Sequence, residues 1–182
     1  MRKKYVAYIN TSLDVTSDEI STLLSTIMSK KWREAYLLFS FDARAQSSGY
    51  EGFSLFFKHF QKDALVTAEL LKNVLSSLNK EMSFAAVAEV ANSGSKITDL
   101  VEAFLNEKKE SIKQFERLKE LLVEDFSYRM AIEKAINEII AKEFDDKHKV
   151  EVLLKTLERA NGDYSAILTI DRKLGENYNG NN

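Results

Sequence analysis

The sequence contains no cysteine and no proline among its 182 residues. Without cysteine, the chain has no disulfide, no thiolate zinc site, no iron–sulfur ligation and no cysteine nucleophile. The lack of proline favours long helices, because proline breaks helix interiors. The absence of cysteine fits the reducing environment of the cytoplasm, where we expect the protein to be located.

Long apolar runs and an excess of one charge are also missing. No run approaches the roughly 18 apolar residues that a transmembrane helix needs. The apolar run after residues 1–4 is too short for a cleaved signal peptide. With 26 basic and 28 acidic side chains, the net charge is −2. We therefore expect neither a nucleic-acid partner nor a membrane partner.

What the sequence has in abundance is apolar residues at helical spacing. The apolar fraction of 45% is typical of a globular protein. A capping-box pattern at residues 16–19 predicts the start of a first helix, and a similar pattern at 48–51 predicts the start of a second. Gly162 and Gly175 predict helix ends. The expected helices are about 16–45, 48–78, 96–123 and 125–159, with a short fifth helix at about 163–173.

Residues 79–95 lack a helical period, and we expect an extended crossover there. A connection of this length allows the second and third helices to run parallel, as in four-helix bundles with one crossover. The sequence therefore predicts an all-α fold, with a bundle at 16–175, an N-terminal extension at 1–15 and a flexible tail at 176–182.

Four short segments carry a resemblance to a known family. They are residues 36–42 (YLLFSFD), 52–57 (GFSLFF), 103–108 (AFLNEK) and 170–175 (IDRKLG), and the gaps between them also agree to within one or two residues. In this order and spacing they resemble the ferritins, which implies a ferritin-like bundle and a hollow shell of many subunits that stores iron. A shell of 24 copies, or one mixed with a catalytic ferritin chain, is the partner arrangement that the resemblance implies.

The same resemblance tests the iron chemistry residue by residue. Iron that is oxidised in a bundle needs carboxylates and a histidine, often as a Glu-x-x-His step. Thr67 stands where the family has the histidine, Ala64 replaces a carboxylate one turn earlier, and Ile27 replaces a glutamate of the first helix. Glu107 alone matches a ligand. Iron binding remains possible, but we expect neither a complete di-iron site nor enzyme activity.

Two further carboxylates match the family where iron enters or mineral forms. Glu133 matches one acid of the three-fold channel, while Met130 falls near the other. Glu69 matches the acidic inner surface, which Leu65 and Val66 make less acidic. The candidate metal-binding residues are therefore Glu107, Glu133 and Glu69.

Lys31 and Glu34 lie near the middle of the first helical face and are spaced to pair with each other. We interpret them as part of a structural ion-pair network, which Glu107 could join, with Asp63 or Lys62 nearby. Non-catalytic ferritin chains carry a salt bridge in this space, so the resemblance favours the same interpretation. The alternatives are a solvated surface and a weak metal site.

The two histidines give no catalytic pair. His59 lies in an aromatic run and is interpreted as a boundary or packing residue. His148 could bind a metal with Asp145, but the charged run 142–149 favours a solvated face. Exposed aromatic residues such as Tyr36, or Tyr5 and Tyr8, could mark subunit contacts.

The leading hypothesis is a non-catalytic ferritin-type subunit of an iron-storage shell. The alternative is a ferritin-like structural or binding assembly that no longer handles iron. An enzyme with a di-iron centre is disfavoured because its ligands are replaced.

Overall fold

A computed structural model describes residues 2–78, 94, 96–124 and 126–179, with side chains for 18–78, 94, 96–123, 130 and 132–179. None of the helices searched in this part of the chain is long and apolar enough to cross a membrane. The described residues form five helices: α1 Arg2–Ser47, α2 Glu51–Ser77, α3 Ile97–Glu124, α4 Phe126–Ala160 and α5 Tyr164–Tyr178.

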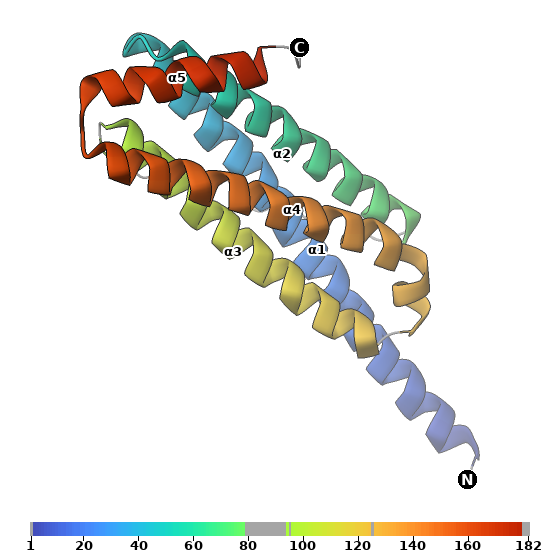
Figure 1. The fold of residues 1–182 in the computed structure, drawn as a ribbon. Helices are drawn as coiled ribbons and strands as arrows, with labels where there is room; N and C mark the ends of the chain where they lie inside the picture. Colours follow the sequence, from blue (N-terminus) through green and yellow to red (C-terminus); the bar gives the residue numbers. More distant parts are fainter. Residues whose placement is uncertain (1, 79–93, 95, 125, 180–182) are drawn as a thin grey trace.

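Helices α1 to α4 form a bundle, and α5 lies across one end of it (Figure 1). Helices α2 and α3 run in the same direction, antiparallel to α1 and α4, so α2 ends and α3 begins at opposite ends of the bundle (Figure 1). The predicted all-α four-helix bundle with one long crossover and a short fifth helix is confirmed. The predicted extended form of the crossover falls on residues 79–93 and 95, outside the described residues.

Two predicted helix bounds are wrong. Helix α1 begins at Arg2 rather than at Thr16, because no glycine or proline interrupts the chain before Gly49 and a capping pattern alone does not stop a helix. Helix α5 continues past Gly175 to Tyr178. A Cβ on Gly175 would lie 3.8 Å from the Gly52 Cα, an ordinary van der Waals contact, and Gly175 lies within the helix rather than at its end.

The start of α2 also differs from the capping pattern in the sequence. Tyr50 occupies the N-cap position and makes no side-chain cap. Instead, the buried carboxylate of Asp171 on α5 accepts a 2.9 Å hydrogen bond from the Phe53 N–H. A Cβ on Gly52 would lie 1.7 Å from the Asp171 carbonyl oxygen, so only glycine allows this approach. Helix α5 thereby caps α2 from a distant part of the chain.

Two hydrophobic clusters fill the bundle. One lies toward α5 and is rich in phenylalanine, including Phe41, Phe53, Phe56, Phe57, Phe60 and Phe104. The other, toward the opposite end, is mostly aliphatic and includes Ile20, Leu24, Leu71, Leu118, Ile132 and Ile136.

Candidate functional site: a buried layer of charge

A layer of buried charge separates the two hydrophobic clusters. Each contributing helix passes from one cluster to the other through a charged segment: Lys31 and Glu34 on α1, Lys108 on α3, and Glu143 and Asp146 on α4. These side chains are at most 3% exposed. The 3.6-residue period places them on the same faces as the core residues before and after them.

Two lysine ammonium groups hold this layer together. The Lys31 Nζ lies 2.6 Å from Glu34 Oε2 and 2.7 Å from Glu143 Oε1. The Lys108 Nζ lies 2.9 Å from Glu34 Oε1, 3.3 Å from Glu143 Oε2 and 3.5 Å from Asp146 Oδ2. The Lys108–Glu34 contact is a close ion pair that lacks the alignment of a hydrogen bond. Each glutamate therefore contacts both lysines.

Lys108 also has aromatic neighbours. Its Nζ lies 5.7 Å from the centroid of the Phe60 ring and 5.4 Å from that of Phe104. Such cation–π contacts add a favourable interaction for a desolvated ammonium group. An unpaired charge at this depth costs several kcal/mol, so both the carboxylates and the rings favour the buried lysine.

The pKa values of Glu34 and Lys108 favour the ionised form of both groups. Burial alone would raise the pKa of Glu34, but Lys31 and Lys108 outweigh it and lower that pKa to about 2. Burial opposes the charge of Lys108, yet Glu34, Glu143 and Asp146 raise its pKa above the ordinary value. Both groups are therefore charged at neutral pH.

The layer reaches the surface between α2 and α4 through Lys142. Its Nζ lies 2.6 Å from Asp63 Oδ2 and 3.2 Å from Asp146 Oδ2. His59 Nε2 lies 3.4 Å from Asp63 Oδ2, and the His59 ring packs against Phe60 and Tyr178. The interpretation of His59 as a packing residue is confirmed, and His148 is exposed as the charged run predicts.

The predicted pair of Lys31 and Glu34 is present, but Glu107 does not join it. Arg33 Nη1 donates a 2.6 Å hydrogen bond to Glu107 Oε1, and both side chains are about one quarter exposed. The next residue, Lys108, points into the bundle instead. The possibility that Glu107 joins the network is therefore not realised, because the helix phase of α3 turns it toward α1 and the surface.

The other two candidate metal-binding residues lie in separate surroundings. Glu69 is exposed and pairs with Lys72 on the same helix. Glu133 is half-buried and lines a groove between α3 and α4 with Ile136 and Asn137. Among the residues that were searched, no three His, Cys, Asp or Glu side chains are placed to hold a metal ion.

The positions where the family resemblance places replaced ligands are in the core. Ile27 and Ala64 are each 1% exposed, and Thr67 is 4% exposed. The Thr67 hydroxyl donates a 2.9 Å hydrogen bond to the Asp63 carbonyl oxygen. These side chains therefore pack and bond within the bundle.

Sequence reasoning missed Lys108, Glu143 and Asp146. A signal for the last two was available, because both continue the face of Ile136 and Ile140 toward Val150. The charged run 142–149 hid it, since such a run usually marks a solvated surface. For Lys108, the residue type itself argued against burial.

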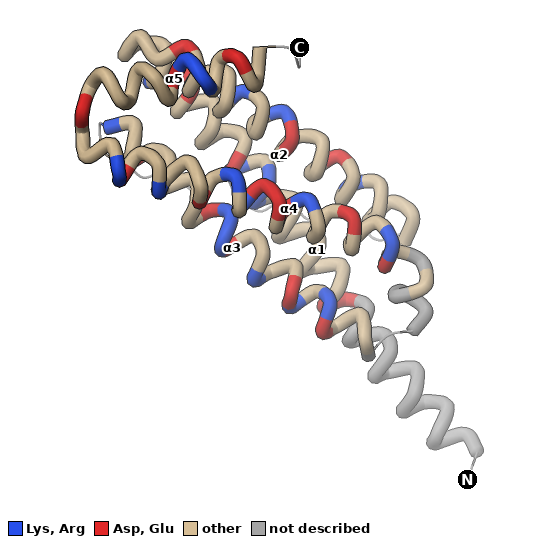
Figure 2. Tube along the Cα trace, in the orientation of Figure 1, with Lys and Arg blue, Asp and Glu red and all other residues tan. Residues whose placement is uncertain are grey.

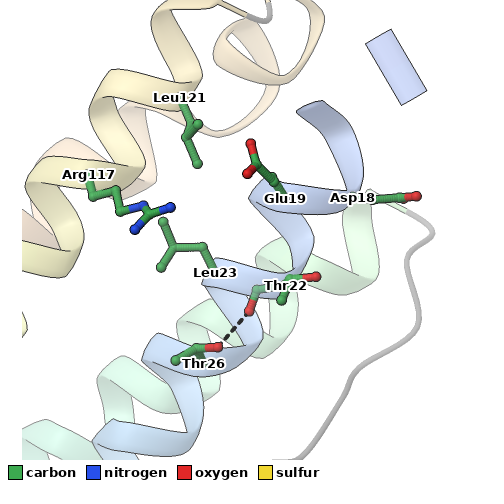
Figure 3. A pocket seen from close by; sticks show the side chains of 7 residues that line it. All are labelled: Asp18, Glu19, Thr22, Leu23, Thr26, Arg117 and Leu121. Carbon is green, nitrogen blue, oxygen red and sulfur yellow. Dashed lines mark hydrogen bonds between the residues drawn. The ribbon is translucent and has the colours of Figure 1, made fainter. Parts of the chain in front are cut away.

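A shallow groove between α1 and α3 is a second surface feature (Figure 3). Leu23 and Leu121 lie on its two sides, with Glu19 and Arg117 at its rim (Figure 3). Its α1 lining lies on the turns before Lys31, so it is separate from the charged layer. It is lined by Asp18, Glu19, Thr22, Leu23, Thr26, Arg117 and Leu121.

Comparison with known proteins relates this architecture to solved structures. No family model and no curated protein matches the chain. An open-pore ferritin from the archaeon Archaeoglobus fulgidus superposes with a TM-score of 0.79 at 17% identity, over 86% of this chain and 95% of that one. A humanized archaeal ferritin gives 0.79 at 15% identity, over 86% and 93%. An engineered closed form of the Archaeoglobus fulgidus ferritin gives 0.78 at 17%, over 86% and 94%.

These likenesses cover nearly the whole of the compared structures, and they include the bundle that holds the charged layer. The identities are low, so what they establish is the architecture. The family resemblance of the four sequence segments is confirmed at that level: this chain has the ferritin fold.

Proposed function

We propose that the chain is a non-catalytic ferritin-type subunit of a hollow, oligomeric iron-storage shell, without an intact ferroxidase centre. The observation that carries the proposal is the pair of ammonium groups at the centre of a ferritin-fold bundle. The subunit would build a shell from copies of itself, with 24 the expected number, or complete one with a catalytic ferritin chain.

The buried layer supports the lack of ferroxidase activity. The iron ions of a di-iron centre are held by carboxylate oxygen and imidazole nitrogen. At this level of the bundle the chain instead places Lys31 and Lys108, and a lysine ammonium has no lone pair to offer a metal. Their positive charges also repel a cation. The residues present therefore do not fit a di-iron centre.

An exposed aromatic stripe on α1 supports assembly. Trp32, Tyr36 and Phe39 are 46%, 60% and 56% exposed, and their spacing places them on one face of the helix. Exposed aromatic residues grouped in this way are typical of protein interfaces. A second copy of the chain is the partner that a homo-oligomeric shell would place there. Tyr5 and Tyr8 fall outside the described side chains.

A second candidate function is an assembly that no longer handles iron. Two of the acids expected to contact iron are paired with basic side chains. Arg33 neutralises Glu107 and Lys72 neutralises Glu69, which favours this second function. A shell with these acids paired would have fewer free carboxylates on which mineral could form.

The experiment that separates these functions combines solution mass with iron loading. A closed 24-subunit shell of this 20.8 kDa chain has a mass of about 500 kDa. A shell that takes up mineral from ferrous iron, alone or with a catalytic chain, supports storage. A shell without mineral under both conditions supports the second function, and a monomer or dimer contradicts both.

Two further measurements sharpen the result. Rapid ferrous oxidation by the purified protein alone would contradict the non-catalytic assignment. Tyr36→Glu should reduce the solution mass while circular dichroism stays helical, because a charge enters the proposed interface. Glu110→Gln, an exposed change on α3, is the matched control and should leave the mass unchanged.

A further inference from the structure

The short turn that joins α4 to α5 contains an asparagine followed by a glycine. It consists of Asn161, Gly162 and Asp163, and all three residues are exposed. We propose that the Gly162 backbone nitrogen attacks the Asn161 side chain, so that the asparagine is converted into aspartate and isoaspartate as the protein ages. The proposal concerns this turn alone and holds whether or not the chain builds a shell or handles iron.

The backbone of the turn explains why these two residue types occur together. Asn161 has φ +46° and Gly162 has φ +79°, so both lie in the left-handed region. Among the described residues, Asn161 is the one residue other than glycine with a positive φ. Glycine and asparagine adopt this conformation more readily than other residues, and they commonly end helices in this way. The end of α4 therefore favours an Asn-Gly pair at this point.

The reacting groups of the turn are open to one another. No hydrogen bond of the described residues involves the Asn161 side-chain amide or the Gly162 N–H. A Cβ placed on Gly162 would have nothing within 4 Å, so the space around its backbone is free. Glycine also has no side chain that would hinder the approach of its nitrogen to the asparagine Cγ. The attacking nitrogen is therefore neither bonded nor shielded.

The reaction needs only the turn and water. The Gly162 nitrogen gives its proton to hydroxide and forms a bond to Asn161 Cγ. The bond between Cγ and Nδ2 then breaks, and the side-chain nitrogen takes up protons from water and leaves as ammonia. The product is a succinimide ring, in which the Gly162 nitrogen is bonded both to Cγ and to the backbone carbonyl carbon of Asn161.

Water opens this ring in one of two ways. Hydrolysis of the bond between the nitrogen and Cγ gives aspartate with a normal main chain. Hydrolysis of the bond between the nitrogen and the backbone carbonyl carbon gives isoaspartate, whose main chain runs through the former side chain. Neither route oxidises or reduces the protein, and the net change is the loss of ammonia and the gain of water.

Two exposed asparagines elsewhere in the chain serve as internal references. Asn106 lies within α3 and Asn137 lies within α4, and a glutamate follows each of them. The N–H of the residue after a helical asparagine is bonded within the helix, so it is not free to attack. We therefore expect both to remain asparagine. The Asn-Gly pair recurs at residues 179–180, but residue 180 lies outside the described residues.

The modification would weaken the link between α4 and α5. Either product adds a carboxylate at the C-terminal end of α4, where the helix dipole disfavours negative charge. Isoaspartate also adds a methylene group to the main chain directly before Asp163, whose carboxylate caps α5 by accepting a 2.8 Å hydrogen bond from the Ala166 N–H. Since the Phe53 N–H is bonded to Asp171 of α5, we expect exchange of this amide hydrogen to report the loosening.

The test is peptide mapping of the full chain after incubation for days at mildly alkaline pH. In a tryptic digest Asn161, Asn106 and Asn137 fall in separate peptides with one asparagine each, residues 160–172, 97–108 and 135–142. Liquid chromatography with mass spectrometry separates and identifies the aspartate and isoaspartate forms. We expect Asn161 to be converted at least about tenfold faster than the two helical asparagines, whose neighbouring N–H groups are bonded. Isoaspartate should appear together with aspartate.

Asn161→Gly is the matched variant, because glycine keeps the left-handed conformation and has no amide to lose. Exchange of the Phe53 amide hydrogen should become faster as the unaltered protein ages and stay constant in Asn161→Gly. Conversion of Asn161 no faster than that of the two helical asparagines would overturn the proposal. Faster conversion with unchanged Phe53 exchange would support the modification site and contradict its effect on α5.

Discussion

The chain forms the same kind of ion pair in two settings. Lys31 and Glu34 lie three residues apart and pair at 2.6 Å in the bundle centre, with side chains 1% and 3% exposed. Glu110 and Lys113 also lie three residues apart and pair at 2.6 Å, but with side chains 59% and 68% exposed. Charged residues of both signs occur along the length of α3 and α4 (Figure 2). The two pairs therefore have equal distances but different effects on stability.

The difference lies in what happens when one partner is lost. A surface partner returns to water, and such pairs contribute about 0–1 kcal/mol. In the centre the remaining partner stays buried and uncompensated, which costs about 3–5 kcal/mol. Replacing a whole buried network by apolar residues is often neutral. A buried pair is thus sensitive to single changes without being a source of net stability.

The largest expected effect is that of Glu143→Leu. It removes a carboxylate shared by Lys31 and Lys108 and should lower the free energy of unfolding by about 3–5 kcal/mol. Urea unfolding followed by circular dichroism measures this loss. A loss below about 1 kcal/mol would mean that the centre is solvated and that the contrast with the surface fails.

Acid should weaken the buried pair over a defined pH range. The pKa of Glu34 in the folded chain is about 2, below the ordinary value of 4.5. The stability from its charge is therefore present above pH 4.5 and is lost as pH falls from 4.5 toward 2. From the pKa difference, this loss is on the order of 3 kcal/mol. Unfolding midpoints measured across this range should decline, and Glu34→Gln should flatten the decline.

Glu107→Leu tests an intermediate setting. Arg33 would lose the anion that its guanidinium contacts at 2.6 Å, but it is one quarter exposed and can reach water. We expect a loss of about 1 kcal/mol in the free energy of unfolding. Equilibrium dialysis should show unchanged iron binding in this variant. A large loss of bound iron would show that Glu107 is a ligand.

The smallest expected effect is that of Lys113→Ala. The free energy of unfolding should change by no more than about 0.5 kcal/mol. Raising the salt concentration should remove even this difference, because exposed charges are screened. The Glu143→Leu effect should persist in the same salt. If both effects vanish together, burial is not what distinguishes the pairs.

The fold could be predicted from the sequence because helices and the crossover leave local signals. The apolar period identifies α1 to α4, and the long connection after Leu78 allows the second and third helices to run parallel. Only Lys31 and Glu34 of the charged layer could be predicted from the sequence. Lys31 and Glu34 pair within one turn, whereas Lys108 and Glu143 are 35 residues apart and meet only in the folded bundle. The spacing of residues along the sequence does not predict such a contact.

The contact between Gly52 and Asp171 has a consequence for how the chain reaches its native state. The hydrogen bond from Phe53 to Asp171 joins residues 118 positions apart. Helix α2 therefore acquires its cap only after α5 has been synthesised and has docked. Contacts of such long sequence separation form late in folding and slow it. In a nascent chain, the Phe53 N–H would remain without this acceptor until the last helix arrives.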